Sequence, residues 1–314
     1  MAAEAQASPA AAVTVGKLVV LGVGLIGGSF ALALRAAGCV GTVVGVGRSR
    51  ANLETARELG IIDRLATSDG DWPQETADAD LVLVAAPVAQ YPALLAAMAG
   101  RLGARTIVTD AGSTKQDVIA AARAALPGSL ARFVPGHPIA GTENSGAAAA
   151  FPTLFAQRNV VLTPLAETDP EATATVAALW TVCGSRVRVL SPQAHDRVFA
   201  AVSHLPHLLA FGLVEAFAAR PDADDLFRFA ASGFRDFTRI AASSPEMWRD
   251  ISLANRDALE AEVAAFRVQL DRLAAMIAAG DGAALEAVFA RASAARRAWA
   301  AASGAAPADG PRET

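Results

Sequence analysis

The stretch Lys17-Leu18-Val19-Val20-Leu21-Gly22-Val23-Gly24-Leu25-Ile26-Gly27-Gly28-Ser29 decides the fold of the N-terminal half of the chain. Its apolar start, its glycines and the apolar segment 30–37 that follows predict a strand, a tight turn and a helix. The pattern G-x-G-x-x-G alone is weak evidence, because such turns also serve packing. Between a strand and a helix it indicates dinucleotide binding, since glycines let a pyrophosphate approach the helix N-terminus. We expect the cofactor to contact Gly22, Gly24, Leu25, Ile26 and Gly27.

The end of the next predicted strand, residues 42–46, bears on the choice of cofactor. An NAD site usually has Asp or Glu there, about 20 residues past the glycines, to bind the ribose 2′-hydroxyl. This chain has Gly47-Arg48-Ser49-Arg50 and no carboxylate. Arg48 and Ser49 would hold a 2′-phosphate through charge-assisted hydrogen bonds, although surface arginines are often simply solvated. We therefore expect NADP, or the use of both NADP and NAD.

Further apolar runs predict more strands of the same parallel sheet, with helices near 50–59, 90–102, 115–125 and 169–182. The runs cover residues 81–88, 106–110, 132–135, 159–163 and 186–190. Ligands of such sheets bind outside the carboxyl ends of the strands. We therefore expect Pro87, Ser113 and Lys115 to face the same crevice as Gly24, and Ala86 and Pro87 to contact the cofactor. Ser113 would equally suit an ordinary helix N-cap for residues 115–125.

The polar loop of this half is Gly136-His137-Pro138-Ile139-Ala140-Gly141-Thr142-Glu143-Asn144-Ser145-Gly146. It combines an imidazole, a carboxylate and two hydroxyls in a stretch too rich in glycine to predict a helix or a strand. The loop follows a predicted strand and should therefore lie at the crevice. A histidine before proline can also serve only to bind backbone groups, so this loop alone does not establish a catalytic role.

Past Ser191-Pro192 the sequence shows helical periodicity and no strand-like runs. We therefore place a dinucleotide-binding domain at residues 17–190 and a helical domain at 191–302. The ends, residues 1–16 and 303–314, are rich in alanine and contain proline, and are expected to be disordered tails. The amphipathic segments 253–280 and 282–300 are typical of an oligomer interface, so we expect a homodimer through the helical domain.

Two side-chain pairs of the helical half have the spacing of neighbours on a helix. His204 and His207 are three residues apart, if Pro206 does not kink the helix between them. They suggest no metal site, because no third ligand lies nearby. Arg235 and Arg239 are four apart and would aim at one anion. Pairing of either arginine with Asp236, Glu246 or Asp250 is an equal alternative.

The composition bounds the class of protein. A chain of 314 residues is long enough for two domains with their own cores. With a net charge of −4 it offers no basic field for nucleic acid or anionic lipid. Residues 1–16 lack the positive start of a secretory signal peptide, and no uninterrupted apolar run reaches the roughly 20 residues that span a bilayer. We therefore expect a cytoplasmic protein that binds neither membrane nor nucleic acid, with Cys39 and Cys183 as buried apolar residues.

These features together resemble the prephenate/arogenate (cyclohexadienyl) dehydrogenase family of tyrosine biosynthesis. The resemblance covers roughly residues 17 to 300 and depends on an ordered series of motifs rather than on any single one. The motifs are G-V-G-L-I-G-G-S at 22–29, D-A-G-S-T-K at 110–115, G-H-P-I-A-G-T-E at 136–143, S-H-L-P-H at 203–207, D-F-T-R at 236–239 and M-W-R-D at 247–250.

The resemblance implies an α/β Rossmann-type N-terminal domain followed by an all-α C-terminal dimerisation domain. It also implies oxidative decarboxylation of prephenate to 4-hydroxyphenylpyruvate, and of arogenate to tyrosine if both substrates are used, with hydride transfer to NAD(P). We expect neither a chorismate mutase domain before residue 17 nor a regulatory amino-acid-binding domain after residue 300. Any feedback by tyrosine would then act at the active site.

The family's functional residues transfer to matching positions of this sequence. His137 matches the catalytic base and Ser113 the serine that orients the substrate hydroxyl. Arg239 matches the arginine that binds a substrate carboxylate, a task for which a guanidinium is well shaped. The other substrate-binding candidates are Ser203, His207, Glu143, Trp248 and His204. For Glu143, Trp248 and His204 a purely structural role is an equal alternative.

Three other functions compete with this one. Residues 144–157 contain no acid that would attract the side-chain ammonium of arogenate, which favours prephenate or both substrates over an arogenate-specific NADP enzyme. A reductase of the β-hydroxyacid or imine type would use a catalytic lysine in its second domain, and residues 116–314 contain no lysine. A protein that only senses NADP would bind the cofactor without turnover.

Overall fold

The computed structural model describes residues 13–142 and 144–303. The chain forms two compact units, Met1–Leu259 and Glu260–Thr314. The tails expected at 1–16 and 303–314 lie mostly outside the described residues. Strand β1, however, begins at Val15, inside the stretch expected to be tail. The backbone amide of Val15 donates to the carbonyl of Cys39 at 2.9 Å, which extends the pairing of β1 with β2 beyond the apolar run.

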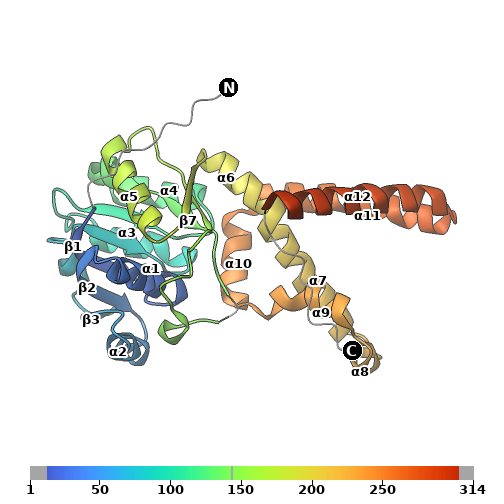
Figure 1. The fold of residues 1–314 in the computed structure, drawn as a ribbon, viewed down its shortest axis with the longest axis horizontal. Helices are drawn as coiled ribbons and strands as arrows, with labels where there is room; N and C mark the ends of the chain where they lie inside the picture. Colours follow the sequence, from blue (N-terminus) through green and yellow to red (C-terminus); the bar gives the residue numbers. More distant parts are fainter. Residues whose placement is uncertain (1–12, 143, 304–314) are drawn as a thin grey trace. The chain divides into compact units, whose positions relative to one another are not determined.

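A six-stranded parallel sheet forms the centre of the first unit (Figure 1). Its strand order is β3-β2-β1-β4-β5-β6, the order of a Rossmann-type sheet. The predicted fold class is thus confirmed. The order reverses between β1 and β4, and a ligand crevice is expected at their carboxyl ends. The strands are β1 (Val15–Leu21), β2 (Val40–Gly47), β3 (Arg64–Thr67), β4 (Leu81–Val84), β5 (Ile107–Asp110) and β6 (Phe133–Val134).

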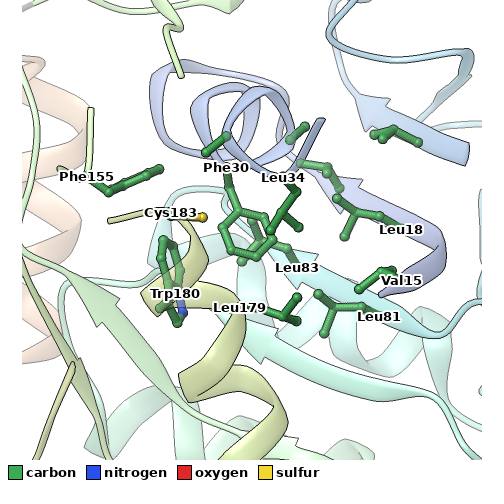
Figure 2. Packing of buried hydrophobic residues seen from close by; sticks show 14 of the residues in the cluster. Val15, Leu18, Phe30, Leu34, Leu81, Leu83, Phe155, Leu179, Trp180 and Cys183 are labelled. Atoms are coloured by element: carbon green, nitrogen blue, oxygen red, sulfur yellow. The ribbon is translucent and has the colours of Figure 1, made fainter. Parts of the chain in front are cut away.

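Helices cover both faces of this sheet because alternate residues of each strand point to opposite sides. Leu18 and Leu83 pack against α1 (Leu25–Ala36), α2 (Arg50–Glu58) and α5 (Pro170–Val182). Val19 and Val82 pack against α3 (Tyr91–Met98) and α4 (Gln116–Ala125). Figure 2 shows the first of these layers, in which Phe30 of α1 meets Trp180 of α5 with ring centroids 4.6 Å apart. Cys39 and Cys183 are buried in the same layer, as expected.

The strands after residue 135 form a second sheet, although those expected at 159–163 and 186–190 were predicted to extend the first one and residues 136–138 were not expected to form a strand. Strands β7 (Gly136–Pro138), β8 (Asn159–Leu162) and β9 (Arg186–Val189) are ordered β7-β8-β9, with β7 antiparallel to β8. Pro135 has no amide to continue the pairing of β6 with β5. The amide of the next residue, Gly136, donates to the Asp110 carboxylate at 2.9 Å instead, and the chain turns away from the first sheet.

The rest of the described chain is helical, as predicted. The first unit continues with α6 (Pro192–Phe199), a π-helical turn η5 (Ala200–His204), α7 (Leu205–Ala218), α8 (Ala223–Arg228), α9 (Ser232–Thr238), η6 (Arg239–Ala242), α10 (Pro245–Ala254) and the start of α11 (Arg256–Ala278). Short 3₁₀ helices lie at η1 (Trp72–Thr76), η2 (Val88–Gln90), η3 (Pro127–Arg132) and η4 (Ala147–Ala149). The second unit contains the rest of α11 and α12 (Gly282–Ser303).

Pro206 does not end the helix that carries His204 and His207. The helical stretch Pro192–Ala218 is continuous, and the π-helical turn Ala200–His204 precedes the proline. By length and composition this one stretch would suffice to cross a membrane, a test that core helices of soluble proteins also pass. Here the stretch carries buried His195 and Asp196, which bind other parts of the first unit.

Candidate active site

The glycine turn after β1 leaves open space at the N-terminus of α1. Gly22 has a φ of +101°, and a Cβ there would lie 2.4 Å from the carbonyl oxygen of Ala85, so only glycine fits. A Cβ on Gly24 would meet nothing within 4 Å. No side chain in the described part of the chain caps α1 at Gly24, so the first amides of the helix keep no capping partner from it. A pyrophosphate fits this combination of free amides, helix dipole and open space.

Of the two arginines at the end of β2, Arg50 is held by another side chain and Arg48 by none among residues 13–142 and 144–303. The hydroxyl of Ser49 accepts the Asn52 amide at 3.2 Å and caps α2. Arg50 forms an ion pair with Glu54 at 2.9 Å. Arg48 is exposed and forms no hydrogen bond or ion pair with any described residue. Among the described residues, Arg48 is therefore the unpaired cation at the place where a cofactor ribose is expected.

Two further contacts connect the nucleotide turn to neighbouring loops. Asn52 donates through Nδ2 to the carbonyl of Val23 at 2.8 Å and accepts the amide of Ala147 at 2.8 Å. Ala86 and Pro87 follow β4, and a Cβ on Gly22 would lie 3.0 Å from the Ala86 nitrogen. The predicted cofactor-binding residues therefore follow the carboxyl ends of β1 and β4, between which the strand order reverses, and of β2, which neighbours β1.

His137 lies on a short strand and not in an irregular loop as expected. It pairs with Val161 in the β7–β8 ladder, which fixes the direction of its side chain despite the surrounding glycines. The imidazole is half-buried and packs edge-on against Phe199 of α6, with ring centroids 4.8 Å apart. The backbone at His137 is thus held by β8, and its ring is held by side chains of α6.

A chain of hydrogen bonds runs from His137 to Asp196. Nδ1 of His137 lies 2.8 Å from Nε2 of His195, and Nδ1 of His195 lies 2.8 Å from Oδ1 of Asp196. His195 and Asp196 are almost completely buried on α6. Nε2 of His137 takes no part in this chain, which leaves one nitrogen of the ring for a substrate.

Asp196 also caps α4, the task considered for Ser113. Its Oδ1 accepts the amide of Lys115 at 2.8 Å and its Oδ2 accepts the amide of Gln116 at 2.9 Å. The N-cap residue of α4 is Lys115, and Ser113 lies two residues before it, half-buried. The N-cap interpretation of Ser113 is therefore wrong.

Lys115 is buried and does not face the crevice as expected. Its ammonium forms an ion pair with Asp110, and both side chains are fully buried. It also donates to the carbonyl of Gly136 at 2.7 Å, one residue before His137. The other oxygen of Asp110 accepts the Gly136 amide, so the buried pair fixes the start of β7. The D-A-G-S-T-K motif thus positions the strand that carries His137.

Burial keeps the imidazoles of this region neutral. It lowers the pKa of His137 well below its usual range, and His195, Lys115 and His204 lower it further. Burial also lowers the pKa of His195, although its hydrogen bond to Asp196 opposes the shift. At Asp196 burial acts to raise the pKa, but hydrogen bonds from His195, Gln116 and Lys115 outweigh it and the pKa falls. At neutral pH the hydrogen-bonded series from His137 to Asp196 therefore consists of two neutral imidazoles and one carboxylate.

A second group of polar residues gathers between α7 and α10. The ring of His207 stacks on that of Trp248 with centroids 3.5 Å apart, and its Nδ1–H donates to the carbonyl of Ser203 at 2.8 Å. His204 is buried, and its Nδ1 lies 3.1 Å from Nδ2 of Asn255. Burial lowers the pKa of His204 to about 4. Its Nε2 and the indole nitrogen of Trp248 are buried without a hydrogen-bond partner among the described residues.

Arg239 lies close to His207. It opens η6, which packs against α7, and its positive charge lowers the pKa of His207, adding to the larger effect of burial. Arg235 lies on α9, which ends at Thr238, so the two arginines do not share one α-helix. Of the acids considered as their partners, Asp250 pairs with Arg249. Glu143 lies outside the described residues.

The structure thus brings together residues that the sequence motifs indicate and others that no motif indicates. His137 and His195 are 58 residues apart in the chain, so no local pattern connects them. Asn255, which donates to the backbone carbonyl of Asp196 at 2.8 Å, was also missed. The sequence signal that could have pointed to His195 and Asp196 is their adjacency, because the chain has only four histidines. Among residues 13–142 and 144–303, no group of three or more His, Cys, Asp or Glu side chains is placed to hold a metal ion.

Comparison with family models gives two adjoining matches. Residues 30–189 match the nucleotide-binding domain of prephenate dehydrogenase, and residues 191–291 match its dimerization domain. The two matches adjoin at residue 190, whereas the compact units divide at residue 259.

Individual proteins show the same similarity. A cyclohexadienyl dehydrogenase of Zymomonas mobilis is 38% identical over 267 residues, which cover 84% of this chain and 89% of that protein. A prephenate dehydrogenase of Bacillus subtilis is 40% identical over 242 residues, covering 76% of this chain and 64% of that protein.

Two solved structures share the fold over most of their length. Prephenate dehydrogenase of A. aeolicus, in complex with hydroxyphenyl propionate and NAD+, has a TM-score of 0.85 and 35% identity, and the match covers 91% of this chain and 99% of that one. Arogenate dehydrogenase of Synechocystis has a TM-score of 0.75 and 29% identity, with coverage of 90% and 99%.

Proposed function

Because this chain belongs to the prephenate dehydrogenase family, we propose that it converts prephenate to 4-hydroxyphenylpyruvate with hydride transfer to NAD(P). The observation that carries this proposal is the state of His137. The imidazole is held neutral at a fixed position, and among the described residues only its Nδ1 is bound to another side chain. A neutral imidazole suits a general base that works near pH 7.

In this reaction His137 takes up one proton and later returns it. The bound cofactor supplies the acceptor for the hydride that leaves C4. As that hydride leaves, His137 takes the proton of the 4-hydroxyl, and the ring becomes a dienone. The ring carboxylate then departs as CO2, its electron pair makes the ring aromatic, and His137 returns the proton to the phenolate oxygen. The reaction thus releases no net proton, and aromatisation makes it irreversible.

The remaining residues bind and orient the substrate in this proposal. Arg239 binds a substrate carboxylate, and His207 and Ser203 line the pocket beside it. The charge effect of Arg239 on His207 supports their common location. Ser113, on the segment between β5 and α4, orients the 4-hydroxyl toward His137. Trp248, His204 and Glu143 complete the predicted set, and for Trp248 the stack on His207 supports a place at the pocket.

The cofactor and substrate preferences belong to the same proposal. Arg48, which has no partner among the described residues, supports NADP as the cofactor. NAD is proposed as a second cofactor, because the structure of a relative at 35% identity contains NAD+. The absence of an acid at residues 144–157 supports prephenate, or both prephenate and arogenate. An arogenate-specific NADP enzyme is the alternative.

We also propose a homodimer formed through the helical domain, acting in the cytoplasm. The family model that matches residues 191–291 describes a dimerization domain. Helices α11 and α12 expose large apolar side chains, among them Val268, Leu270, Ile277, Phe289 and Trp299. Such side chains at helical spacing are typical of an interface between subunits.

The test is an assay of the purified full chain with prephenate and arogenate, each with NAD and NADP. The proposal expects reduced cofactor, CO2 and 4-hydroxyphenylpyruvate in equal amounts from prephenate. Binding of NADP without turnover of either substrate would instead support a cofactor-sensing protein. Turnover of arogenate with NADP alone would support the arogenate-specific alternative.

A further inference from the structure

We propose that His195 and Asp196 form a positioning pair that selects the proton-accepting nitrogen of His137. The pair fixes one tautomer of the His137 ring, with the proton on Nδ1 and the lone pair on Nε2. It also stabilises the positive charge that the ring gains when it takes a proton. This inference deepens the proposed function, since the base it describes is the one assigned above.

The selection starts at Asp196, whose carboxylate can only accept hydrogen bonds. Its Oδ1 lies 2.8 Å from Nδ1 of His195, so that nitrogen must carry a proton. In a neutral ring the other nitrogen, Nε2, is then an acceptor. Nε2 of His195 lies 2.8 Å from Nδ1 of His137, which must therefore donate. Nε2 of His137 is left with its lone pair, and the second ring transmits the choice made by the carboxylate.

Asp196 is well suited to this role because its orientation is fixed from the backbone. The amides of Lys115 and Gln116 hold both carboxylate oxygens, and Asn255 holds the Asp196 carbonyl. Rotation of the carboxylate would break bonds at the start of α4. His195 is similarly confined, because Phe199 packs against it one helical turn later with ring centroids 4.5 Å apart.

The charges around the pair make the carboxylate necessary. The positive charge of Lys115 disfavours a positive charge on either imidazole, and at His195 its partner Asp110 acts in the opposite direction. His204 of the π-helical turn is the other titratable group that lowers the pKa of His137, and burial lowers its own pKa to about 4. Asp196 is therefore the acceptor that supports a protonated His137 through the intervening ring. During the transfer one proton is gained at Nε2 of His137, and none has to leave Nδ1.

A direct test is independent of any substrate. Long-range proton–nitrogen NMR of the ¹⁵N-labelled full chain identifies which nitrogen of each imidazole is protonated, and the chain has four histidines to assign. Loss of signals in His137→Asn and His195→Gln assigns the two rings. At pH 7.5 the proposal expects both rings to be neutral and protonated on Nδ1. A His137 ring protonated on Nε2 would overturn it.

Kinetics of matched variants test the effect on catalysis. A glutamine at 195 can place its carbonyl oxygen where Nε2 accepts from His137, whereas a leucine cannot. His195→Leu should lower kcat about 10²-fold or more with KM within about threefold, and His195→Gln should recover most of that loss. Equal losses in the two variants would contradict the positioning role. Asp196→Asn should also lower kcat strongly. The asparagine NH2 group can donate to Nδ1 of His195, which would reverse the tautomers of both imidazoles and place the proton of His137 on Nε2.

Asp169→Asn is the matched control for Asp196→Asn, because Asp169 also caps a helix with its carboxylate, at α5, but takes no part in the chain to His137. Equal activity in the two aspartate variants would reject the inference. Nδ1 protonation of both rings without turnover of prephenate would leave the positioning pair intact and reject the proposed function. Turnover of prephenate by a protein whose His137 is protonated on Nε2 would support the proposed function and reject the positioning pair.

Discussion

The imidazole of His207 lies nearly parallel to the indole of Trp248, with ring centroids 3.5 Å apart and 19° between the ring planes. The stack and the Nδ1–H bond to Ser203 together fix the His207 ring and leave its Nε2 as an acceptor. We predict that Trp248→Ala raises KM for prephenate and lowers the free energy of unfolding by about 3 kcal/mol. Trp248→Phe keeps a ring to stack on and should lose about 1 kcal/mol. Unchanged KM in Trp248→Ala would exclude a role for the stack in substrate binding.

Replacement by alanine should lower the stability of the fold at one glycine of the nucleotide turn and the affinity for the cofactor at another. At Gly22 a Cβ meets the Ala85 carbonyl and the φ is positive, so Gly22→Ala should destabilise the fold by at least about 2 kcal/mol. At Gly24 a Cβ has space, so Gly24→Ala should unfold at the wild-type denaturant concentration. The added methyl group would occupy the space assigned to the pyrophosphate and should raise the Kd for NAD(P) at least about tenfold. Wild-type cofactor affinity in Gly24→Ala would place the pyrophosphate elsewhere.

Arg48 and Arg50 form a matched pair for testing the cofactor preference. Arg48 has no partner among the described residues, whereas Arg50 is paired with Glu54. Arg48→Ala should raise KM for NADP by roughly tenfold to a hundredfold, the effect of losing a charge-assisted hydrogen bond, and leave KM for NAD unchanged. Arg50→Ala should change neither constant by more than about twofold. Equal effects of Arg48→Ala on both cofactors would reject 2′-phosphate binding at this residue.

Buried His204 should make the fold sensitive to acid. Its pKa falls from 6.5 to about 4 on folding, so the unfolded chain binds a proton that the folded chain resists. The stability of the neutral form is complete above pH 6.5 and is lost as the pH falls toward 4. Between pH 7 and pH 5 the wild type should lose on the order of 2 kcal/mol more than His204→Asn, whose carbonyl oxygen can accept from Asn255. Urea unfolding at several pH values measures this difference, and parallel stability curves would contradict it.

Local patterns predicted the central fold because they arise from neighbours in the chain. The glycine turn after β1 and the apolar runs of β4 and β5 are such patterns, and the sheet order agrees with them. Strand β3 was not predicted, because it is short, lies largely half-exposed at the sheet edge and has no strong apolar run. The second sheet depends on Pro135 and on the competing bond from Gly136 to Asp110, which spans 26 residues of sequence.

The site was predicted less completely, for the same physical reason. His137 and Arg239 lie in recognisable motifs, whereas the partners of His137 come from a helix that starts 55 residues later. Lys115 looked like a crevice residue because it follows a strand, but its partner Asp110 on that strand draws it into the core. Contacts between distant segments of this kind decide the state of the base, and they become visible only in the folded chain.

The rate of cofactor reduction in a single turnover with saturating prephenate tests the central claim most directly, when wild type is compared with His137→Asn. Asparagine keeps a polar side chain on β7 but has no nitrogen that accepts a proton near neutral pH. We predict a rate lower by a factor of about 10² to 10⁴, with KM for prephenate little changed. A His137→Asn variant that reduces its cofactor within about threefold of the wild-type rate would contradict the assignment of His137 as the base.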